Sequence, residues 1–478
     1  MVTLSNKAGA EGPQPGFIRR KQSNITMNKP LNLAIIGCGA VIEELHLPSL
    51  RRLSRQGALR VSMLVDPSPD RMARLHRHFP EAVCIDDIER AFPRPGTDLA
   101  LVASPPSLHR RHVLTALSFG CDVLCEKPLA ISPSDVVEMS RAAERHARIL
   151  MVGMTRRFFP SLATAASLLQ KGMLGEGIQF SCLEGGVYQW PIASDAPFRR
   201  EAGGGGVLVD KGVHVLDSLL WLFGPMTVTQ CQEDALAGGV EGNCRLQLEG
   251  KARGTMQLSW DQPIASGLHV RGSLGEMRVD PTEFRWIELR LEGCAWKRVP
   301  CGTRWPMSLS QSKPRTSAPR VYEDCIHLQW IQFLRSVTYG EPLPAGPREA
   351  HIVARQIESA FAMATPLPQL WLGAGEQSAA SRRHWKNSPP AETGAGISGG
   401  TPLPHSHLGS SPAAGGGGGD GPRPPLQTNW GSSPLAAEGG GGTAQTNKPL
   451  QGPDPTPLSL SAALLPYPGT QSEGREQI

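Results

Sequence analysis

Short apolar runs alternate with longer amphipathic segments from residue 31 to residue 152. The runs are too short for helices and rich in Val, Ile and Leu, which is typical of strands buried on both faces of a parallel sheet. The expected strands are Leu33–Ile36, Leu59–Val65, Val83–Ile85, Asp98–Ala103, Asp122–Cys125 and Ile149–Val152. The expected helices between them are Ala40–Leu53, Asp70–Phe79, His109–Phe119 and Ser132–Ala147. This alternation predicts an α/β domain over residues 30–152, with a doubly wound parallel sheet.

The alternation of short strands and helices ends after Gly153. Crowded strand-like runs with short turns between them indicate a mostly antiparallel open sheet, so residues 153–372 are predicted to form an α+β domain. Its expected strands are Met226–Gln232, Cys244–Leu248, Gly254–Trp260, Leu268–Arg271, Glu276–Val279 and Trp286–Leu291. Its expected helices are Pro160–Leu174, Val207–Phe223, Tyr322–Tyr339 and Arg348–Met363.

Both ends of the chain differ in composition from these two domains. Residues 1–29 are polar and irregular, and we expect a disordered extension there. Residues 373–478 are rich in Gly, Pro, Ser and Thr, with pure glycine runs at 415–419 and 439–442. Such a segment buries too little apolar surface to offset its ordering entropy, so we expect a disordered tail.

A glycine turn follows the first expected strand. Gly37-Cys38-Gly39 separates this strand from a helix that begins near Ala40 and Val41. In a dinucleotide-binding (Rossmann) unit, the first glycine makes the turn and the second lets the backbone approach a pyrophosphate. The helix N-terminus then supplies free N–H groups. The two glycines, Ala40 and Val41 are therefore candidate cofactor-binding residues, although a glycine turn by itself is a weak signal.

Asp66 ends the second expected strand. At this position of a dinucleotide domain a carboxylate accepts hydrogen bonds from the ribose hydroxyls and repels a 2′-phosphate, which favours NAD over NADP. The alternative is an ordinary strand-end aspartate in a proline turn.

Three further candidates follow the fourth expected strand. Ser104 and Pro105 lie where the carboxyl ends of parallel strands line the ligand crevice. His109 either contacts the cofactor or caps its own helix, and we favour a structural role.

The fifth expected strand ends at Glu126-Lys127-Pro128. A charged pair directly after an apolar strand points into the crevice or forms a surface salt bridge. In the crevice, the ammonium of Lys127 would polarise a substrate oxygen near the nicotinamide, because it stabilises developing negative charge. Pro128 could fix this geometry through a cis peptide bond. Glu126 and Lys127 both enter the set of candidate cofactor-binding residues.

Asp210 and His214 lie four positions apart on an otherwise apolar expected helix, so they share one face. Such groups are costly there unless they are paired or functional. A histidine can accept a hydroxyl proton near neutral pH, and Asp210 could raise its basicity. A satisfied buried Asp–His pair is the equally weighted alternative.

Charge and cysteine usage narrow the class of protein. The net charge is +5, and paired arginines are scattered along the chain, so no nucleic-acid partner is expected. No metal site is expected, because the ten cysteines contain no C-x-x-C pair, and Cys121 and Cys125 are interpreted as buried thiols. The most apolar helical stretch, Gly206–Gly224, contains charged residues, and the N-terminus lacks an apolar signal core. We therefore expect a cytoplasmic protein that does not bind membranes.

Three segments together resemble the glucose–fructose oxidoreductase/inositol dehydrogenase (Gfo/Idh/MocA) family. They read AIIGCGAVIEELHLPSL, ASPPSLHRRHVLTALSFGCDVLCEKPLA and GGGGVLVDKGVHVLDSLLWLFG. The Glu-Lys-Pro motif and the Asp-x-x-x-His helix carry most of the specificity, and Arg156-Arg157-Phe158 also resembles the family pattern. The resemblance covers residues 31–366.

The resemblance implies an NAD(P)-dependent dehydrogenase or reductase that acts on a sugar, cyclic polyol or nucleotide sugar. It implies that Lys127 orients the substrate hydroxyl, that Asp210 contacts the substrate and supports His214, and that His214 is the general base or acid. It places Gly37, Gly39 and Asp66 at cofactor positions, with NAD as the expected cofactor, and it implies a homodimer or homotetramer. A non-catalytic NAD-bound sensor or assembly subunit on the same fold is the alternative.

Two residues depart from the family pattern. Ile42 stands where a small residue usually lies, so we expect a slightly remodelled pyrophosphate turn. Lys211, beside Asp210, either faces the cleft, where it would favour an anionic substrate, or is solvated, which we favour. The residues Tyr188, Trp190, Arg199 and Arg200 are expected at the rim of the substrate cleft.

Overall fold

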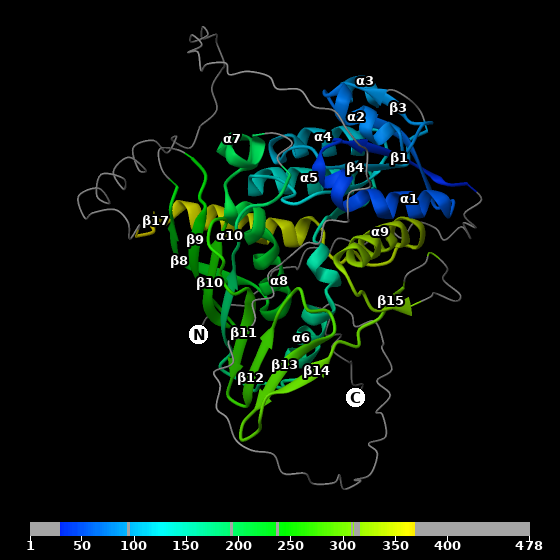
Figure 1. The fold of residues 1–478 in the computed structure, drawn as a ribbon. Helices are drawn as coiled ribbons and strands as arrows, with labels where there is room; N and C mark the ends of the chain where they lie inside the picture. The colour runs from blue at the N-terminus through cyan, green and yellow to red at the C-terminus, as the bar shows by residue number, and fades with distance from the viewer. Residues whose placement is uncertain are drawn as a thin grey trace, which may run out of the picture. The chain divides into compact units, whose positions relative to one another are not determined.

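The computed structural model describes residues 29–92, 96–191, 195–235, 239–306, 309 and 316–368. The predicted tail at 373–478 and all but the last residue of the predicted extension at 1–29 lie outside the described residues. Within the described part the chain forms two domains, each built around its own sheet (Figure 1).

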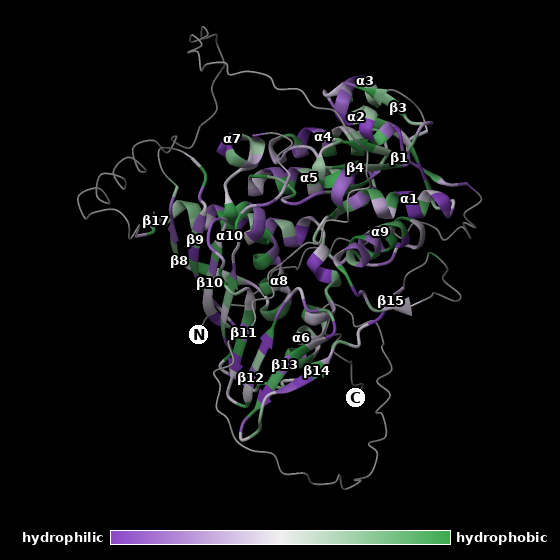
Figure 2. Cartoon of the chain, viewed as in Figure 1, coloured by the Kyte–Doolittle hydropathy of each residue, from purple (hydrophilic) through white to green (hydrophobic). Residues whose placement is uncertain are grey.

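The first sheet has six parallel strands in the order β3-β2-β1-β4-β5-β6. The strands are β1 (Leu31–Ile36), β2 (Leu59–Val65), β3 (Val83–Ile85), β4 (Leu99–Val102), β5 (Asp122–Cys125) and β6 (Leu150–Val152). This is the strand order of a Rossmann dinucleotide-binding sheet, in which ligands bind where the order reverses, between β1 and β4. All four residues of β4 and all four of β5 are buried. β4 is apolar throughout (Figure 2), whereas β5 begins with the buried Asp122, whose carboxylate accepts a hydrogen bond from the backbone N–H of Ile149.

Helices cover this sheet. They are α1 (Leu47–Arg55), α2 (Pro69–His76), α3 (Ile88–Ala91), α4 (Pro106–Ser118) and α5 (Pro133–Arg145). The hydroxyl of Ser132 caps α5 by accepting a hydrogen bond from the backbone N–H of Asp135, as its position before the apolar run predicts. The predicted helix at 40–53 is wrong in one respect, because its first turn is a π-helix, η1 (Ile42–His46), which contains the fully buried Ile42.

The second domain holds a nine-stranded sheet in the order β14-β13-β12-β11-β7-β10-β9-β8-β17. Its strands are β7 (Gln179–Glu184), β8 (Met226–Glu233), β9 (Asn243–Gly250), β10 (Arg253–Ser259), β11 (Gly267–Gly272), β12 (Gly275–Val279), β13 (Trp286–Leu291), β14 (Lys297–Pro300) and β17 (Ala364–Pro366). Only the β7–β10 and β8–β17 pairs are parallel, so the sheet is mostly antiparallel as predicted. A small separate pair consists of β15 (Trp305–Pro306) and β16 (Thr316–Ser317).

The remaining helical elements are η2 (Thr155–Phe158), α6 (Pro160–Gln170), η3 (Ala196–Phe198), α7 (Arg200–Gly203), η4 (Leu208–Gly212), α8 (Val213–Phe223), α9 (Tyr322–Tyr339) and α10 (Pro347–Ala362). The predicted helix at 207–223 again begins with a π-helix, η4, before α8 continues it. Two late helices tie the domains together: α9 packs on α1, and α10 packs on both α5 and α8 (Figure 1).

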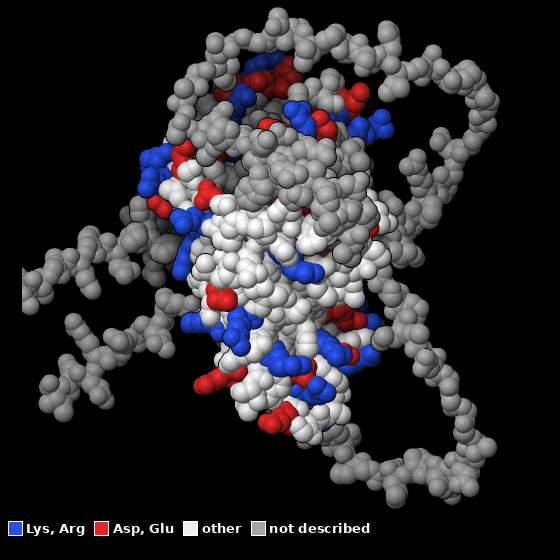
Figure 3. Space-filling model, turned by 90° about the vertical axis from the view of Figure 1, so that its left-hand side faces the viewer, with Lys and Arg blue, Asp and Glu red and all other residues white. Residues whose placement is uncertain are grey.

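Charged side chains of both signs are interspersed on the face turned to the viewer in Figure 3. Outward positions of the second sheet contribute exposed polar groups, including Arg245, Gln247 and Arg253. No helix among the described residues is long and apolar enough to cross a membrane.

Candidate active site at the carboxyl edge of the first sheet

The glycine turn after β1 has no room for a side chain at its first position. Gly37 has a φ of +91°, and a Cβ atom there would lie 2.6 Å from the backbone nitrogen of Ser104. At Gly39 a Cβ atom would meet no atom within 4 Å, so the space in front of this residue is open. The turn then enters η1, with the N–H groups of Ile42 and Glu43 both directed at the Gly39 carbonyl. The close approach is therefore made at Gly37, and the free space lies at Gly39.

Asp66 is hydrogen-bonded to this turn. Its carboxylate is 3% exposed and accepts hydrogen bonds from the backbone N–H groups of Cys38 and Ser68, each at 2.8 Å. The guanidinium of Arg71 lies 3.5 Å from the same carboxylate. The predicted cofactor residue thus lies beside the glycine turn, and an arginine that the sequence analysis missed stands next to it.

His109 bridges two loops of the crevice. Its ring nitrogens lie 2.8 Å from the carbonyl oxygen of Pro128 and 2.7 Å from that of Ser104. Burial lowers the pKa of His109, although both carbonyls favour the protonated ring. The histidine does not cap α4, whose N-cap is Pro105. Its structural role is to join the loop after β4 to the loop after β5.

Glu126 is held by a hydrogen-bonded chain of two side chains, Trp330 and His46. The indole of Trp330, on α9, donates to Nδ1 of His46 at 2.9 Å, and Nε2 of His46 lies 2.9 Å from Oε1 of Glu126. Because an indole only donates, Nδ1 accepts and Nε2 carries the hydrogen that is donated to the carboxylate. Burial raises the pKa of Glu126, but the His46 hydrogen bond and the charge of Lys127 together lower it below its usual value. Glu126 is therefore an anion at the carboxyl end of β5.

Lys127 joins the two domains. The peptide bond between Lys127 and Pro128 is cis, as the sequence suggested. The ammonium donates to the backbone carbonyl of Asp210 at 3.0 Å and to its Oδ1 at 2.9 Å. The indole of Trp260, at the end of β10, donates to the other carboxylate oxygen at 3.2 Å. Enclosure raises the pKa of Asp210, but the charge of Lys127 and the hydrogen bonds from Lys127 and Trp260 together hold the pKa below its usual value.

His214 lies one helical turn beyond Asp210, and the expectation that Asp210 raises its basicity is wrong. Nδ1 of His214 is buried and has no hydrogen-bond partner among the described residues. Burial lowers the pKa of His214 well below its usual value, and the positive charges of Lys127 and Arg156 lower it further. The Asp210 carboxylate is committed to Lys127 and Trp260. The imidazole is therefore neutral at pH 7.

The start of the helix that carries both residues is held by Glu241, which the sequence analysis did not single out. This fully buried carboxylate accepts hydrogen bonds from the backbone N–H groups of Gly206 and Leu208, at 2.9 and 3.0 Å. A Cβ atom at Gly206 would lie 2.0 Å from the carbonyl oxygen of Glu241, so only glycine fits. Burial raises the pKa of Glu241 to about 7.

The two arginines after β6 anchor this helix and the sheet. Arg156 makes a two-pronged pair with Glu184 of β7, with both N–O distances at 2.7 Å. Arg157 makes a buried two-pronged pair with Asp217 of α8, at 2.8 and 2.7 Å. The Arg-Arg-Phe motif thus fixes the element that carries His214 relative to the β6 end.

Lys211 is only partly exposed, whereas the favoured interpretation was a solvated side chain. It is partly buried, and its ammonium donates to the carbonyl oxygen of Ser259 at 3.3 Å. Burial lowers the pKa of Lys211, while the charges of Glu184 and Asp210 oppose this shift. Its cation therefore belongs to the electrostatics of the cleft.

The expected rim residues divide into two groups. Tyr188 packs edge-on against Trp260 at 5.2 Å, and burial together with the charge of Asp210 raises its pKa to about 12. Trp190 is 36% exposed, and Arg199 is exposed and lies 3.5 Å from Asp195. Arg200 instead stacks over the ring of Phe361 on α10.

The cysteines predicted to be buried thiols are found as such. Cys121 and Cys125 are buried and free, as predicted, and burial raises the pKa of Cys121 to about 12. No group of three or more His, Cys, Asp or Glu side chains able to hold a metal ion lies within the described residues.

Comparisons with known proteins identify the family and the fold. The D-glucoside 3-dehydrogenase of Escherichia coli (strain K12) is 29% identical over 201 residues, which are 41% of this chain and 55% of the relative. The chain spans about half the length of the first curated relatives it matches. A 3-ketoreductase from Actinomadura kijaniata, solved with NADP and TDP-benzene, has a TM-score of 0.60 at 17% identity and covers 71% of this chain and 99% of its own.

A levoglucosan dehydrogenase solved with NADH and levoglucosan has a TM-score of 0.58 at 18% identity, over 70% of this chain and 98% of its own. At these identities the solved structures show a shared fold. The model of an oxidoreductase family with an NAD-binding Rossmann fold matches residues 31–154, and the model of the GFO/IDH/MocA C-terminal domain matches residues 162–278. With both of its domains matched in order, the chain belongs to the Gfo/Idh/MocA oxidoreductase family.

Proposed function

We propose that this chain is an NAD(P)-dependent oxidoreductase that interconverts a hydroxyl and a keto carbon of a sugar, cyclic polyol or nucleotide sugar. The observation that carries the proposal is the ion pair between Lys127 and Asp210, with His214 one turn away. A cation, an anion and a neutral imidazole meet where the carboxyl end of β5 faces the second domain. This set can orient a hydroxyl group and take its proton.

The glycine turn fits a dinucleotide. The open space at Gly39 would admit a pyrophosphate against the backbone, and the N-terminus of η1 supplies a positive dipole end. Both Asp66 oxygens already accept one backbone hydrogen bond each, and each retains a lone pair for a ribose hydroxyl. We favour NAD, because the buried Asp66 carboxylate would repel a 2′-phosphate, although Arg71 lies beside it. A bound nicotinamide would supply the two-electron carrier.

Lys127 would position the substrate. Two of its three N–H groups are used by Asp210, which leaves one for a substrate oxygen. The ammonium would stabilise negative charge on that oxygen as its proton leaves. The lowered pKa of Asp210 keeps the carboxylate ionised and the lysine in place.

His214 would accept the hydroxyl proton during oxidation and return it during reduction. Its lowered pKa keeps the ring neutral near pH 7, which suits proton acceptance in the oxidation direction. The acid limb of the pH–rate profile should therefore lie below pH 6.5, the ordinary value for a histidine. Lys127 and Arg156 would expel the proton again after turnover, because they disfavour the imidazolium.

The substrate class is supported by the names of the relatives, which act on a D-glucoside and on levoglucosan. The aromatic side chains of Tyr188 and Trp260 beside Asp210 would form one wall of the substrate cleft. We further propose a cytoplasmic homo-oligomer. The ten free cysteines support a reducing compartment, and the open face of the second sheet offers a contact surface.

The test is a panel of sugars, cyclic polyols and nucleotide sugars, incubated with the full chain and with NAD or NADP. Production of reduced nicotinamide is followed by its absorbance. His214→Ala and Lys127→Ala should each lose most turnover and retain NAD binding by calorimetry. If wild-type protein binds NAD and turns over no member of the panel, the chain is a non-catalytic NAD-bound subunit and the proposal fails.

A further inference from the structure

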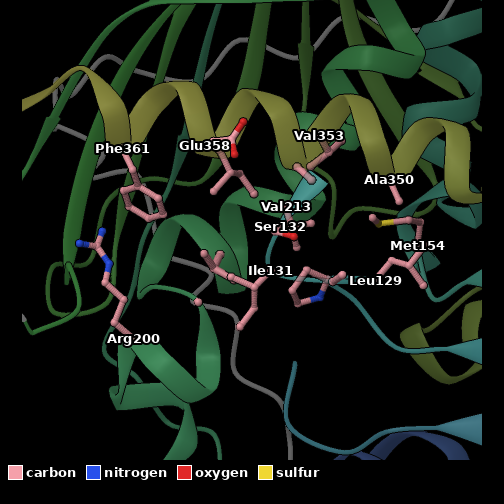
Figure 4. A pocket seen from close by; sticks show the side chains of 16 residues that line it. Leu129, Ile131, Ser132, Met154, Arg200, Val213, Ala350, Val353, Glu358 and Phe361 are labelled. Atoms are coloured by element: carbon pink, nitrogen blue, oxygen red, sulfur yellow. The ribbon is translucent and has the colours of Figure 1, made fainter. Parts of the chain in front are cut away.

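A cavity of about 350 Å³ lies behind the candidate active site, between α10, the segment after the Glu-Lys-Pro motif and the start of the η4–α8 helix. Figure 4 shows Arg200 and Phe361 at one end and Met154 at the other. Most of the lining between these ends is aliphatic, including Ile131 and Ile357. Lys127, Asp210 and His214 do not line it. The cavity is therefore separate from the site described above.

The cavity has one cationic side chain. The guanidinium of Arg200 stacks 4.4 Å above the ring of Phe361. Among the described residues, no hydrogen bond or ion pair to Arg200 is found. Burial raises the pKa of Glu233, and the charge of Arg200 opposes this shift. Arg200 thus presents unfilled N–H donors, held in place on an aromatic face, at the end of an apolar cavity.

We propose that this cavity binds a small amphipathic monocarboxylate, with its carboxylate on Arg200 and its apolar body along α10 towards Met154. A guanidinium pairs with a carboxylate through two parallel hydrogen bonds. Ligand cavities of about 300–1,000 Å³ usually combine apolar walls with a few placed polar groups, as here. Glu358 lines the same cavity and would repel a second negative charge, which selects a monocarboxylate over a dicarboxylate.

The cavity is lined by residues adjacent in sequence to the candidate catalytic groups. Pro128 lines the cavity and follows Lys127, while Val209 and Val213 line it and flank Asp210 on the same helix. An occupant would pack against the back of both elements that carry the candidate catalytic groups. We therefore expect a bound monocarboxylate to change turnover, a consequence that rests on the proposed function. Binding itself does not depend on it.

The experiment uses isothermal titration calorimetry on the full chain with octanoate as the probe. Octanoate should bind the wild type, and Arg200→Gln should weaken binding at least tenfold. Arg199→Gln is the matched control, because Arg199 is exposed and does not line the cavity; binding should be unchanged. Ala354→Phe, which fills the cavity from α10, should abolish binding.

Octan-1-ol has the same chain without the carboxylate, and it should bind at least tenfold more weakly than octanoate. Absence of octanoate binding to the wild type would overturn the proposal, as would equal binding to Arg200→Gln or equal binding of octan-1-ol. If Ala354→Phe does not fold, the two arginine variants still decide the question. Because no turnover is measured, the result is independent of whether the proposed oxidoreductase activity is found.

Discussion

Replacing Gly37 and Gly39 one at a time should separate an effect on stability from an effect on dinucleotide binding. Gly37→Ala places a Cβ atom 2.6 Å from the nitrogen of Ser104 and 2.7 Å from the carbonyl atoms of Ala103, in a residue with a φ of +91°. The positive φ costs about 1–2 kcal/mol for a residue with a side chain. The backbone contacts add about 1–3 kcal/mol, since β4 must shift to relieve them. The sum is roughly 2–5 kcal/mol of unfolding free energy.

Gly39→Ala is the matched control for this loss, because its Cβ atom meets no protein atom within 4 Å. Its Tm should stay within about 2 °C of the wild type, whereas Gly37→Ala should lower the Tm by roughly 5–15 °C. The open space at Gly39 is where a pyrophosphate would approach, so NAD affinity should fall at least about tenfold, or about 1.4 kcal/mol.

The assay is thermal unfolding with and without saturating NAD. Wild-type protein should gain Tm from NAD by mass action, and Gly39→Ala should lose most of this gain with an unchanged Tm in the absence of NAD. Equal Tm losses in the two variants would refute the steric reasoning. An undiminished NAD-induced shift in Gly39→Ala would refute the assignment of the turn to the cofactor.

Three further changes test other parts of the structure. Asp217→Ala removes the carboxylate that pairs with the buried Arg157 and should cost about 3–5 kcal/mol in chemical denaturation, while Arg157→Met combined with Asp217→Leu should recover most of it. Burial lowers the pKa of His112 to about 4, so on acidification the unfolded chain binds a proton before the native protein does. The free energy of unfolding should therefore fall as the pH drops from 6.5 to about 4. His112→Asn should flatten this pH dependence, measured by urea unfolding at each pH. Gly153→Ala places a Cβ atom 2.8 Å from Oε1 of Glu126 and should reduce turnover, measured by the absorbance of reduced nicotinamide; normal turnover would contradict a fixed position for this carboxylate.

Local sequence patterns were enough to predict the first sheet. The strand at Asp122–Cys125 and the helix at Tyr322–Tyr339 occur with the predicted bounds, because a short apolar run behind Asp122 and a long amphipathic period both leave clear signals. The two π-helices were missed. Apolar spacing over a single turn does not distinguish a π turn from an α turn, and both lie at the start of otherwise regular helices. Both also lie beside the candidate site, where π turns are frequent.

The hydrogen-bond partners of the Asp210 carboxylate were also missed, because they lie far from it in the sequence. Helical spacing correctly placed Asp210 and His214 on one helix, but Lys127, 83 residues earlier, takes up the carboxylate. Trp260 donates to the same carboxylate from 50 residues later, and the sequence carries no local signal for this contact. The sequence therefore identifies chemical groups at strand ends and on helices, and the packing of the two domains decides which of them pair.

This pairing changes how the site would handle a proton. An Asp–His pair would store positive charge on the imidazole, as the sequence suggested. The structure instead places the anion of Asp210 on Lys127 and leaves His214 near two cations, with its pKa lowered. A substrate hydroxyl bound to the ammonium of Lys127 would become more acidic through the same positive field that keeps His214 neutral. The neighbouring positive charges would disfavour the protonated imidazole, so His214 would pass the proton on and not retain it.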